Sequence, residues 1–427
     1  MQIYVVQEGD NVDRIAAQIG IPVETLLYDN QIEYPYRLAV GQALFIPSTG
    51  YGRPDGTWIH NSTENTGQTR LADGTNSGNY SGTYSGTYNG NCSGNYGGVP
   101  GTRPSLFVSG YAYPFIQQQI LEDTLPWLTA LNIFSYGFTA QGDLVPPTLD
   151  PAWMIREARL RNVRPVLTLT PLGADGHFNN NLVSVLVSSR SLQQKLVWNL
   201  GSTMEELGYG GLDIDFEYVQ AADREAFAEF VSFTTQVMNL FGYPVTVALA
   251  PKTSRDQPGL LYEGVDYRLL GAAANKVMLM TYEWGYTYGP PMAVAPLNMV
   301  RRVVEYALTE IPPEKIILGI PNYGYDWPLP YVRGTTQAQT LGTREAIQLA
   351  IDHGVEIRFD ETAMSPWFRY WQYGIQHEVW FEDVRSLQAK FNLIKEYGLF
   401  GAGYWQLMRF FRANWLLLGE MFTIQRM

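Results

Sequence analysis

From residue 105 onward, short apolar segments alternate with amphipathic segments, and this alternation constrains the fold more than any other feature of the chain. The amphipathic segments have helical spacing, for example over Ala222–Leu240, Met299–Leu308 and Val384–Tyr397. Eight such units across roughly 300 residues predict an α/β fold, a (β/α)8 TIM barrel. The predicted strands are Leu106–Tyr111, Ile133–Tyr136, Pro165–Leu169, Gly211–Glu217, Thr246–Ala250, Lys276–Tyr282, Ile316–Ile320 and Gly401–Trp405.

The long gap between the seventh and eighth predicted strands has a pattern of its own. Gly342–His353 has helical spacing, and Val355–Phe359 and Tyr370–Phe381 have the composition of strands. We therefore predict a small α+β insertion over residues 330–385, beside the face of the barrel that carries the active site.

The fourth predicted strand carries three acids with a period of two residues. Asp213, Asp215 and Glu217 alternate with apolar residues, so on a strand their carboxylates share one face. Neighbours on that face lie about 6.5–7 Å apart at Cα, which raises the pKa of at least one carboxyl group. A carboxylic acid that stays protonated near neutral pH is what a general acid requires. We predict that Glu217, at the carboxyl end of the strand, is this acid, with Asp213 and Asp215 as the charged or proton-sharing pair behind it.

Two other interpretations of these acids remain open, a salt-bridge cluster at the strand end and a divalent metal site. Asp-x-Asp can bind Mg²⁺, but no histidine lies near in sequence and no phosphate-binding loop is present. The histidines, His60, His177, His353 and His377, are scattered. We predict no metal and no cofactor.

Charge and composition restrict the partners. With 29 basic and 41 acidic side chains the net charge is −12, which argues against nucleic acid and anionic membranes. No apolar run reaches the roughly 18 residues of a membrane span. The first ten residues lack the basic start and apolar stretch of a signal peptide. Aromatic residues make up 14% of the chain, a bias that suits carbohydrate surfaces, and the single cysteine excludes an intrachain disulfide.

Residues 1–48 form a predicted βααβ module. Strand patterns at Ile3–Val6 and Ala43–Pro47 flank helical patterns at Val12–Ile19 and Val23–Tyr28. The module closely resembles a LysM domain, through Val-Val-Gln-Glu-Gly-Asp-Asn-Val, Leu-Leu-Tyr-Asp-Asn and Val-Gly-Gln-Ala-Leu-Phe-Ile-Pro. The resemblance implies binding of N-acetylglucosamine-containing glycans such as peptidoglycan and chitin; a purely structural role is the alternative. The implied contacts are Gly9, Asp10, Asn11, Val12, Asn30, Gln31 and Ile32.

Residues 49–103 are rich in Gly, Ser, Thr, Asn and Tyr and contain almost no aliphatic residues. Such a composition predicts a flexible linker. Four-residue repeats from Ser77 to Tyr96 place several tyrosines and the cysteine in one register, so a second hypothesis is oxidative crosslinking into a protein shell. The residues concerned are Tyr80, Tyr84, Tyr88, Cys92 and Tyr96.

Residues 104–427 resemble glycoside hydrolase family 18, the chitinase-like barrels. The family signature Asp-x-x-Asp-x-Asp-x-Glu matches at Asp213, Asp215 and Glu217, and Met-x-Tyr on strand six and the Trp ending strand eight match at Met280, Tyr282 and Trp405. Two positions depart from the family pattern. The first Asp of the signature is Gly210 here, and the usual Asp after the strand-six tyrosine is Glu283.

The resemblance implies a retaining mechanism in which the 2-acetamido oxygen of the substrate is the nucleophile. Glu217 would act as acid and then base, Asp215 and Tyr282 would hold the acetamido group, and Asp213 would tune Asp215. The rival chemistry is a covalent enzyme nucleophile, Glu283 or Asp326. The implied substrate-binding residues are Trp405, Glu283, Met280 and Tyr323.

A narrower resemblance is to the spore peptidoglycan hydrolases of endospore-forming bacteria, which carry LysM and a family 18 barrel. It rests on Tyr209–Glu217 and on the segment His377–Asp383. It implies an endo-β-N-acetylglucosaminidase made in the mother cell without a signal peptide and located at the spore coat and cortex, with coat proteins as further partners. A chitinase, a non-hydrolytic coat protein that binds glycan, and a cytoplasmic or cell-wall location are the alternatives.

Overall fold

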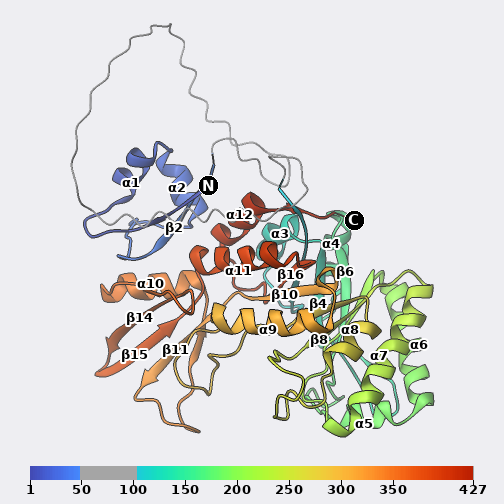
Figure 1. The fold of residues 1–427 in the computed structure, drawn as a ribbon. Coiled ribbons are helices and arrows are strands. Elements are labelled where there is room, and N and C mark those ends of the chain that lie inside the picture. The colour runs from blue at the N-terminus through green and yellow to red at the C-terminus, as the bar shows by residue number, and fades with distance from the viewer. Residues whose placement is uncertain (49–102, 427) are drawn as a thin grey trace, which may run out of the picture.

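The computed structural model describes residues 1–48 and 103–426, which form a small N-terminal module, a barrel and an insertion (Figure 1). The predicted linker, including its tyrosines and Cys92, lies outside the described residues except for Arg103. The linker and its crosslinking therefore stay predictions.

The barrel is closed and parallel, as predicted. Strand β3 pairs with both β4 and β16, so the sheet has no open edge between its first and last barrel strands. The barrel strands, in order around the barrel, are β3 (Ser105–Ala112), β4 (Ala130–Phe138), β6 (Arg164–Leu169), β7 (Gly211–Ile214), β8 (Val245–Leu249), β9 (Lys276–Leu279), β10 (Ile316–Pro321) and β16 (Gly401–Trp405). Two short strands, β5 (Leu144–Val145) and β17 (Thr423–Ile424), add to β4 and β3.

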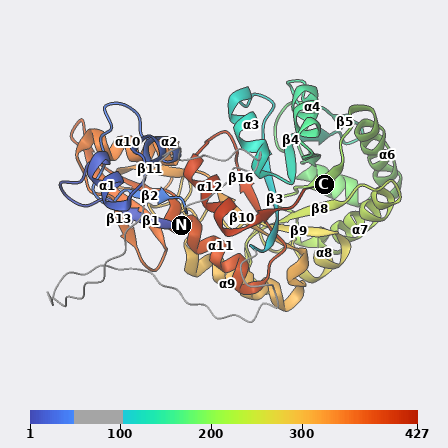
Figure 2. The ribbon, with the colours of Figure 1, turned by 90° about the horizontal axis from the view of Figure 1, so that it is seen from above.

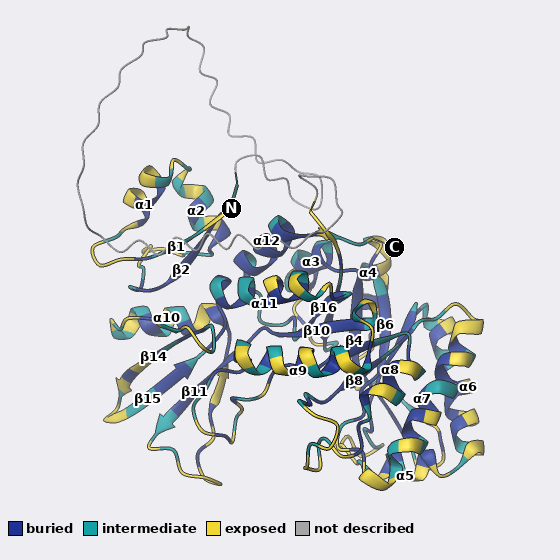
Figure 3. Cartoon of the chain, in the orientation of Figure 1, coloured by how far each residue is buried: buried dark blue, intermediate teal, exposed yellow. Residues whose placement is uncertain are grey.

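Helices surround the strands (Figure 2). Each presents an apolar side to the barrel; on α7, Phe227, Phe230 and Val231 follow helical spacing and are buried, whereas the outer sides of α6 and α7 are exposed (Figure 3). Among the described residues no helix is long and apolar enough to cross a membrane. The helices are α3 (Gln118–Thr124), α4 (Ala152–Leu160), α5 (Asn181–Val187), α6 (Arg190–Leu207), α7 (Arg224–Leu240), α8 (Tyr267–Ala273), α9 (Leu297–Glu310), α11 (Val384–Tyr397) and α12 (Arg412–Met421).

The insertion between β10 and β16 is an antiparallel sheet with one helix. The prediction was right about its place and class, but the sheet starts earlier than residue 330, at Gly324. The predicted single strand Tyr370–Phe381 is wrong, because Tyr373 and Gly374 both have positive φ and make a two-residue hairpin turn. The elements are β11 (Gly324–Leu329), β12 (Gln339–Leu341), α10 (Thr343–His353), β13 (Arg358–Asp360), β14 (Ser365–Gln372) and β15 (Ile375–Trp380).

The N-terminal module has the predicted βααβ order. Its elements are β1 (Gln2–Val5), α1 (Val12–Ile19), α2 (Val23–Asp29) and β2 (Ala43–Ile46), with the two strands antiparallel. The side chain of Asn11 caps α1 by accepting a hydrogen bond from the Arg14 amide, and Gly20 ends it in a left-handed conformation.

This module is packed onto the barrel and the insertion. Phe45 on β2 belongs to the same buried apolar cluster as the barrel core, and β2 lies against α11 and α12. The Ile357 amide donates to the Val40 carbonyl over 2.8 Å. At Gly41, a Cβ atom would lie 1.8 Å from the Ile357 carbonyl oxygen. The backbones of module and insertion therefore meet in direct contact.

Candidate active site

Strand β7 delivers the three predicted acids to one end of the barrel, but the strand itself is shorter than predicted. The strand ends at Ile214. One more hydrogen bond to the neighbouring strand β6 follows, since the Asp215 amide donates to the Leu169 carbonyl over 2.9 Å. The chain then turns at Tyr218, which has a φ of 53°. Asp213 therefore lies inside the barrel, and Asp215 and Glu217 lie above it on the connecting segment.

Asp213 is fully buried and hydrogen-bonded. The Tyr111 hydroxyl donates to it over 2.9 Å. Burial raises its pKa to about 7, against the opposing effect of the nearby polar groups of Tyr111, Asn132 and Thr168. These three residues come from β3, β4 and β6 and were missed in the sequence, where only their place on barrel strands could have indicated them.

Asp215 and Glu217 both have raised pKa values. Burial raises the pKa of Asp215 well above its usual range, with further contributions from the charges of Glu217 and Asp213. Burial and the charge of Glu283 raise the pKa of Glu217. Glu217 remains partly exposed, whereas Asp215 is buried. Three carboxyl groups with raised pKa values thus lie together, and one of them, Glu217, is accessible to a ligand.

Glu283 is held by two tyrosines. The Tyr323 hydroxyl donates to its Oε1, and the Tyr325 hydroxyl donates to the same atom over 3.0 Å. Burial raises the pKa of Glu283, and these two bonds lower it. Its φ of 67° is rare for a side chain of this kind. Tyr323, predicted to bind substrate, contacts Glu283, and its role in substrate binding stays a prediction; Tyr325, on β11, was not predicted.

Aromatic rings gather around Trp405 at the end of β16. Its ring lies 5.0 Å from that of Phe134, 5.7 Å from that of Tyr111 and 6.2 Å from that of Tyr113, all edge to face. Trp405 is half-buried, so part of it is open to a ligand. Tyr282 is buried at the same site, and the pKa of its hydroxyl is raised well above the usual range by burial and by the charges of the nearby acids, Asp215 first.

The remaining predicted residues divide between core and surface. Met280 packs at the edge of the core. In the N-terminal module, Gly9 and Asn11 are exposed, Gln31 and Ile32 are partly buried and Val12 is buried. The Asp10 carboxylate accepts bonds from Tyr4 and Gln7. In the described residues no group of three His, Cys, Asp or Glu is arranged for a metal ion.

Asn30, a predicted glycan contact, has a structural role within the module. Its side chain is buried, donates to the carbonyls of Leu26 and Phe45, and accepts from the Phe45 amide over 2.6 Å. The side chain thus joins α2 to β2, and its predicted glycan contact stays a prediction.

The family model for glycosyl hydrolases family 18 matches residues 167–409, which contain the acids and Trp405. The chain belongs to this family. The LysM model matches residues 4–47. Both resemblances seen in the sequence are confirmed, and so is the prediction of a glycoside hydrolase.

The family 18 chain is similar over its whole length to several known proteins. It is 39% identical to the cortical fragment-lytic enzyme of Bacillus subtilis over 99% of both chains. The crystal structure of the spore cortex-lytic enzyme SleL of Bacillus megaterium superposes with a TM-score of 0.84 at 32% identity, covering 100% of this chain and 99% of that one. A chitinase of Chromobacterium violaceum has a TM-score of 0.68 at 25% identity, covering 74% of this chain and 98% of that one.

The departure at Gly210 from the family 18 signature lies in a confined place. A Cβ atom there would lie 3.0 Å from the Arg164 Cγ atom, so the Arg164 side chain occupies the space that a larger residue would need. This replacement lies just before β7, at the opposite end of the strand from Asp215 and Glu217.

We predict that Asp213→Asn raises thermal stability at alkaline pH. Because the folded-state pKa of Asp213 is raised to about 7, its stabilising contribution is present below pH 4 and is lost as the pH rises through 7. The melting temperature of the variant should exceed that of the native chain by about 2–4 °C at pH 8, and the two should agree at pH 4. Calorimetry at both pH values, with the exposed Asp256→Asn as control, checks this; an equal difference at both pH values contradicts it.

We predict that Glu283→Gln shifts the alkaline limb of the activity profile to lower pH. The charge of Glu283 raises the pKa of Glu217, so its removal lets the acid lose its proton earlier. The pH dependence of kcat, compared with Glu229→Gln on the exposed side of α7, measures the shift. A limb that stays in place or moves to higher pH would rule out this coupling.

Proposed function

We propose that the protein is an endo-β-N-acetylglucosaminidase that hydrolyses spore cortex peptidoglycan by a retaining, substrate-assisted mechanism. The observation that carries the proposal is the column of Asp213, Asp215 and Glu217 beside Trp405, in a chain whose full-length relatives carry names that refer to the spore cortex. The LysM module supports a glycan with N-acetylglucosamine as the partner.

In the proposed reaction, Glu217 donates its proton to the glycosidic oxygen as the acetamido oxygen of the substrate attacks the anomeric carbon. The bond to the leaving sugar breaks and an oxazolinium ion forms. Asp215 stabilises this cation, and Tyr282 donates a hydrogen bond to the acetamido group. Glu217 then accepts a proton from water, which opens the ring with overall retention. The raised pKa of Glu217 suits the acid, because this group must carry a proton to donate it.

A chitinase is the second candidate, favoured by the similarity of the barrel to the Chromobacterium chitinase. A non-hydrolytic coat protein is less well supported, because Glu217 is present and partly accessible. The proposed location is the spore, with the coat and cortex as the site of action.

The test is mass spectrometry of the products formed from purified cortex fragments and from chitin. New reducing-end N-acetylglucosamine from cortex fragments, absent with Glu217→Gln, supports the proposal. Release from chitin alone supports the chitinase. Unchanged substrates together with retained binding would leave a glycan-binding protein without hydrolytic activity.

A further inference from the structure

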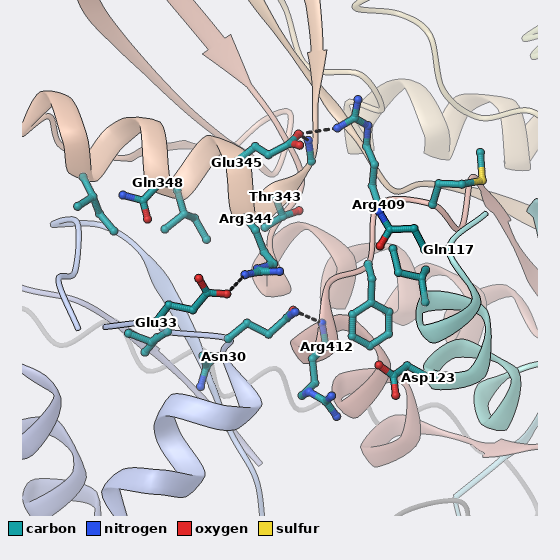
Figure 4. Close-up of a pocket in the computed structure, with 18 of the residues that line it drawn as sticks. Asn30, Glu33, Gln117, Asp123, Thr343, Arg344, Glu345, Gln348, Arg409 and Arg412 are labelled. Carbon is teal, nitrogen blue, oxygen red and sulfur yellow. Dashed lines mark hydrogen bonds and ion pairs between the residues drawn. The ribbon is translucent and has the colours of Figure 1, made fainter. Parts of the chain in front are cut away.

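A cleft of about 1330 Å³ lies outside the catalytic centre, between the LysM module, the insertion and the barrel. Figure 4 shows α10 on one side of it, the module on a second and α3 on a third. Its volume exceeds the roughly 300–1,000 Å³ of pockets that enclose one small molecule. The space therefore suits a segment of a polymer.

The cleft begins where the catalytic centre ends. Tyr113 and Gln406 line it; Gln406 follows Trp405 directly, and the Tyr113 ring lies 6.2 Å from that of Trp405. Burial and the charge of Asp215 raise the pKa of Tyr113, so its hydroxyl lies within electrostatic reach of the catalytic acids. Two residues that line the cleft, Tyr113 and Gln406, thus adjoin Trp405.

An exposed aromatic surface lies beside Tyr113. The Phe115 ring stacks on Tyr113 at 5.0 Å and 17°, and Phe115 is 64% exposed. Apolar faces of sugar rings pack on such aromatic faces. The stacking fixes the Phe115 ring in advance, so a sugar that binds to it need not order a mobile side chain.

The module contributes Gln31 and Ile32, which belong to its predicted glycan-binding loop and line the same cleft. Gln31 is tied to the barrel, since its Oε1 accepts a bond of 2.7 Å from the Arg412 amide. The predicted glycan loop and the catalytic centre thus open onto one cleft.

Among the described residues, Arg412 has no carboxylate within ion-pair distance, although Asp123 lines the same cleft. Its guanidinium lies 4.1 Å from the Tyr28 ring centre and 5.6 Å from that of Phe410. The other arginines of the cleft are all paired. The pairs are Arg37–Asp352, Arg344–Glu33 and Arg409–Glu345.

We propose that this cleft binds the same glycan strand that the catalytic centre cleaves, and that Arg412 binds a carboxylate of the strand's peptide substituents. The inference rests on the proposed function and deepens it. The LysM module then extends the substrate site, and the enzyme distinguishes acidic peptidoglycan from neutral chitin away from the reacting sugar.

The test is calorimetric binding of peptidoglycan oligosaccharides of increasing length to the Glu217→Gln chain. Affinity should rise about tenfold once the oligosaccharide is long enough to reach Phe115. Adding Phe115→Ala should remove this rise. Phe241→Ala is the matched control, because Phe241 is 66% exposed and follows α7 outside the cleft. Affinity independent of length, or equal effects of the two variants, would overturn the proposal.

Arg412→Gln in the same chain tests the charge. It should lower affinity about five- to tenfold for long strands that carry peptides and leave affinity for peptide-free strands of equal length unchanged. An equal loss for both strands would show that Arg412 acts through the packing of the module. If the native chain hydrolyses cortex fragments but affinity does not depend on oligosaccharide length, only this inference is contradicted. No hydrolysis by the native chain removes the proposed function.

Discussion

Glu217→Gln is expected to lower kcat on cortex fragments by roughly 10³–10⁴-fold. The amide cannot donate a proton to the leaving oxygen or accept one from water, and both steps of the proposed reaction need this exchange. The substitution keeps the size of a partly exposed side chain whose neighbours are themselves acidic. Binding of insoluble cortex should be retained, because the aromatic rings and the LysM module are untouched.

Steady-state kinetics and a pull-down on insoluble cortex measure the two effects separately. Glu229→Gln makes the same chemical change on the exposed side of α7 and should keep native kcat. Substantial residual activity in Glu217→Gln, with a pH profile like that of the native chain, would show that another group is the general acid. The proposed mechanism would then be wrong.

Much of this site could be predicted because its signals are local in the sequence. The alternation of acids and apolar residues around Asp213 is contained in one short segment, and residues at the carboxyl ends of barrel strands share one face whatever their distance in the chain. This rule was enough to predict that Tyr282 and Trp405 lie at the same end of the barrel as the acids.

The partners of the acids could not be predicted because they depend on pairings between distant segments. Tyr111 reaches Asp213 across 102 positions, and Tyr325 reaches Glu283 across 42, from a strand of the insertion. Nothing in the local pattern of either tyrosine marks it as a hydrogen-bond donor to a carboxylate. The bonds of Asn30 to Phe45 could not be predicted either, because Phe45 lies 15 positions away in the sequence.

The docking of the LysM module was missed for the same reason. It depends on the Ile357 amide meeting the Val40 carbonyl and on Phe45 entering the barrel core. A composition typical of a linker between module and barrel predicts a loose tether, and the sequence has no separate signal for surfaces that match in shape.

Asp215→Asn is expected to lower kcat by roughly 10²–10³-fold, the second largest effect. The negative carboxylate would stabilise the positive charge of the oxazolinium ion, whereas a neutral amide of the same shape cannot. Because Asp215 is buried, little water screens its charge, and its electrostatic interaction with the cation is stronger than it would be in water. The raised pKa of Asp215 gives a second signature: the group must lose its proton to act, so its removal should also change the acidic limb of the kcat profile.

Measurements of kcat also decide between the proposed mechanism and a covalent enzyme nucleophile. The rival residues are already engaged: Glu283 by Tyr323 and Tyr325, and Asp326 by the Tyr370 hydroxyl at 2.6 Å and by His377 at 3.0 Å. Asp326→Asn should therefore keep most of the native kcat. A substrate that carries a free amine in place of the acetamido group at the reacting sugar should not be cleaved. Two results together would establish a nucleophile supplied by the enzyme. The first is cleavage of that substrate at the native rate, and the second is a loss of kcat in Asp326→Asn or Glu283→Gln as large as that in Asp215→Asn. Retention of configuration at the anomeric carbon, followed by NMR, is common to both mechanisms, so the acetamido dependence is the deciding result.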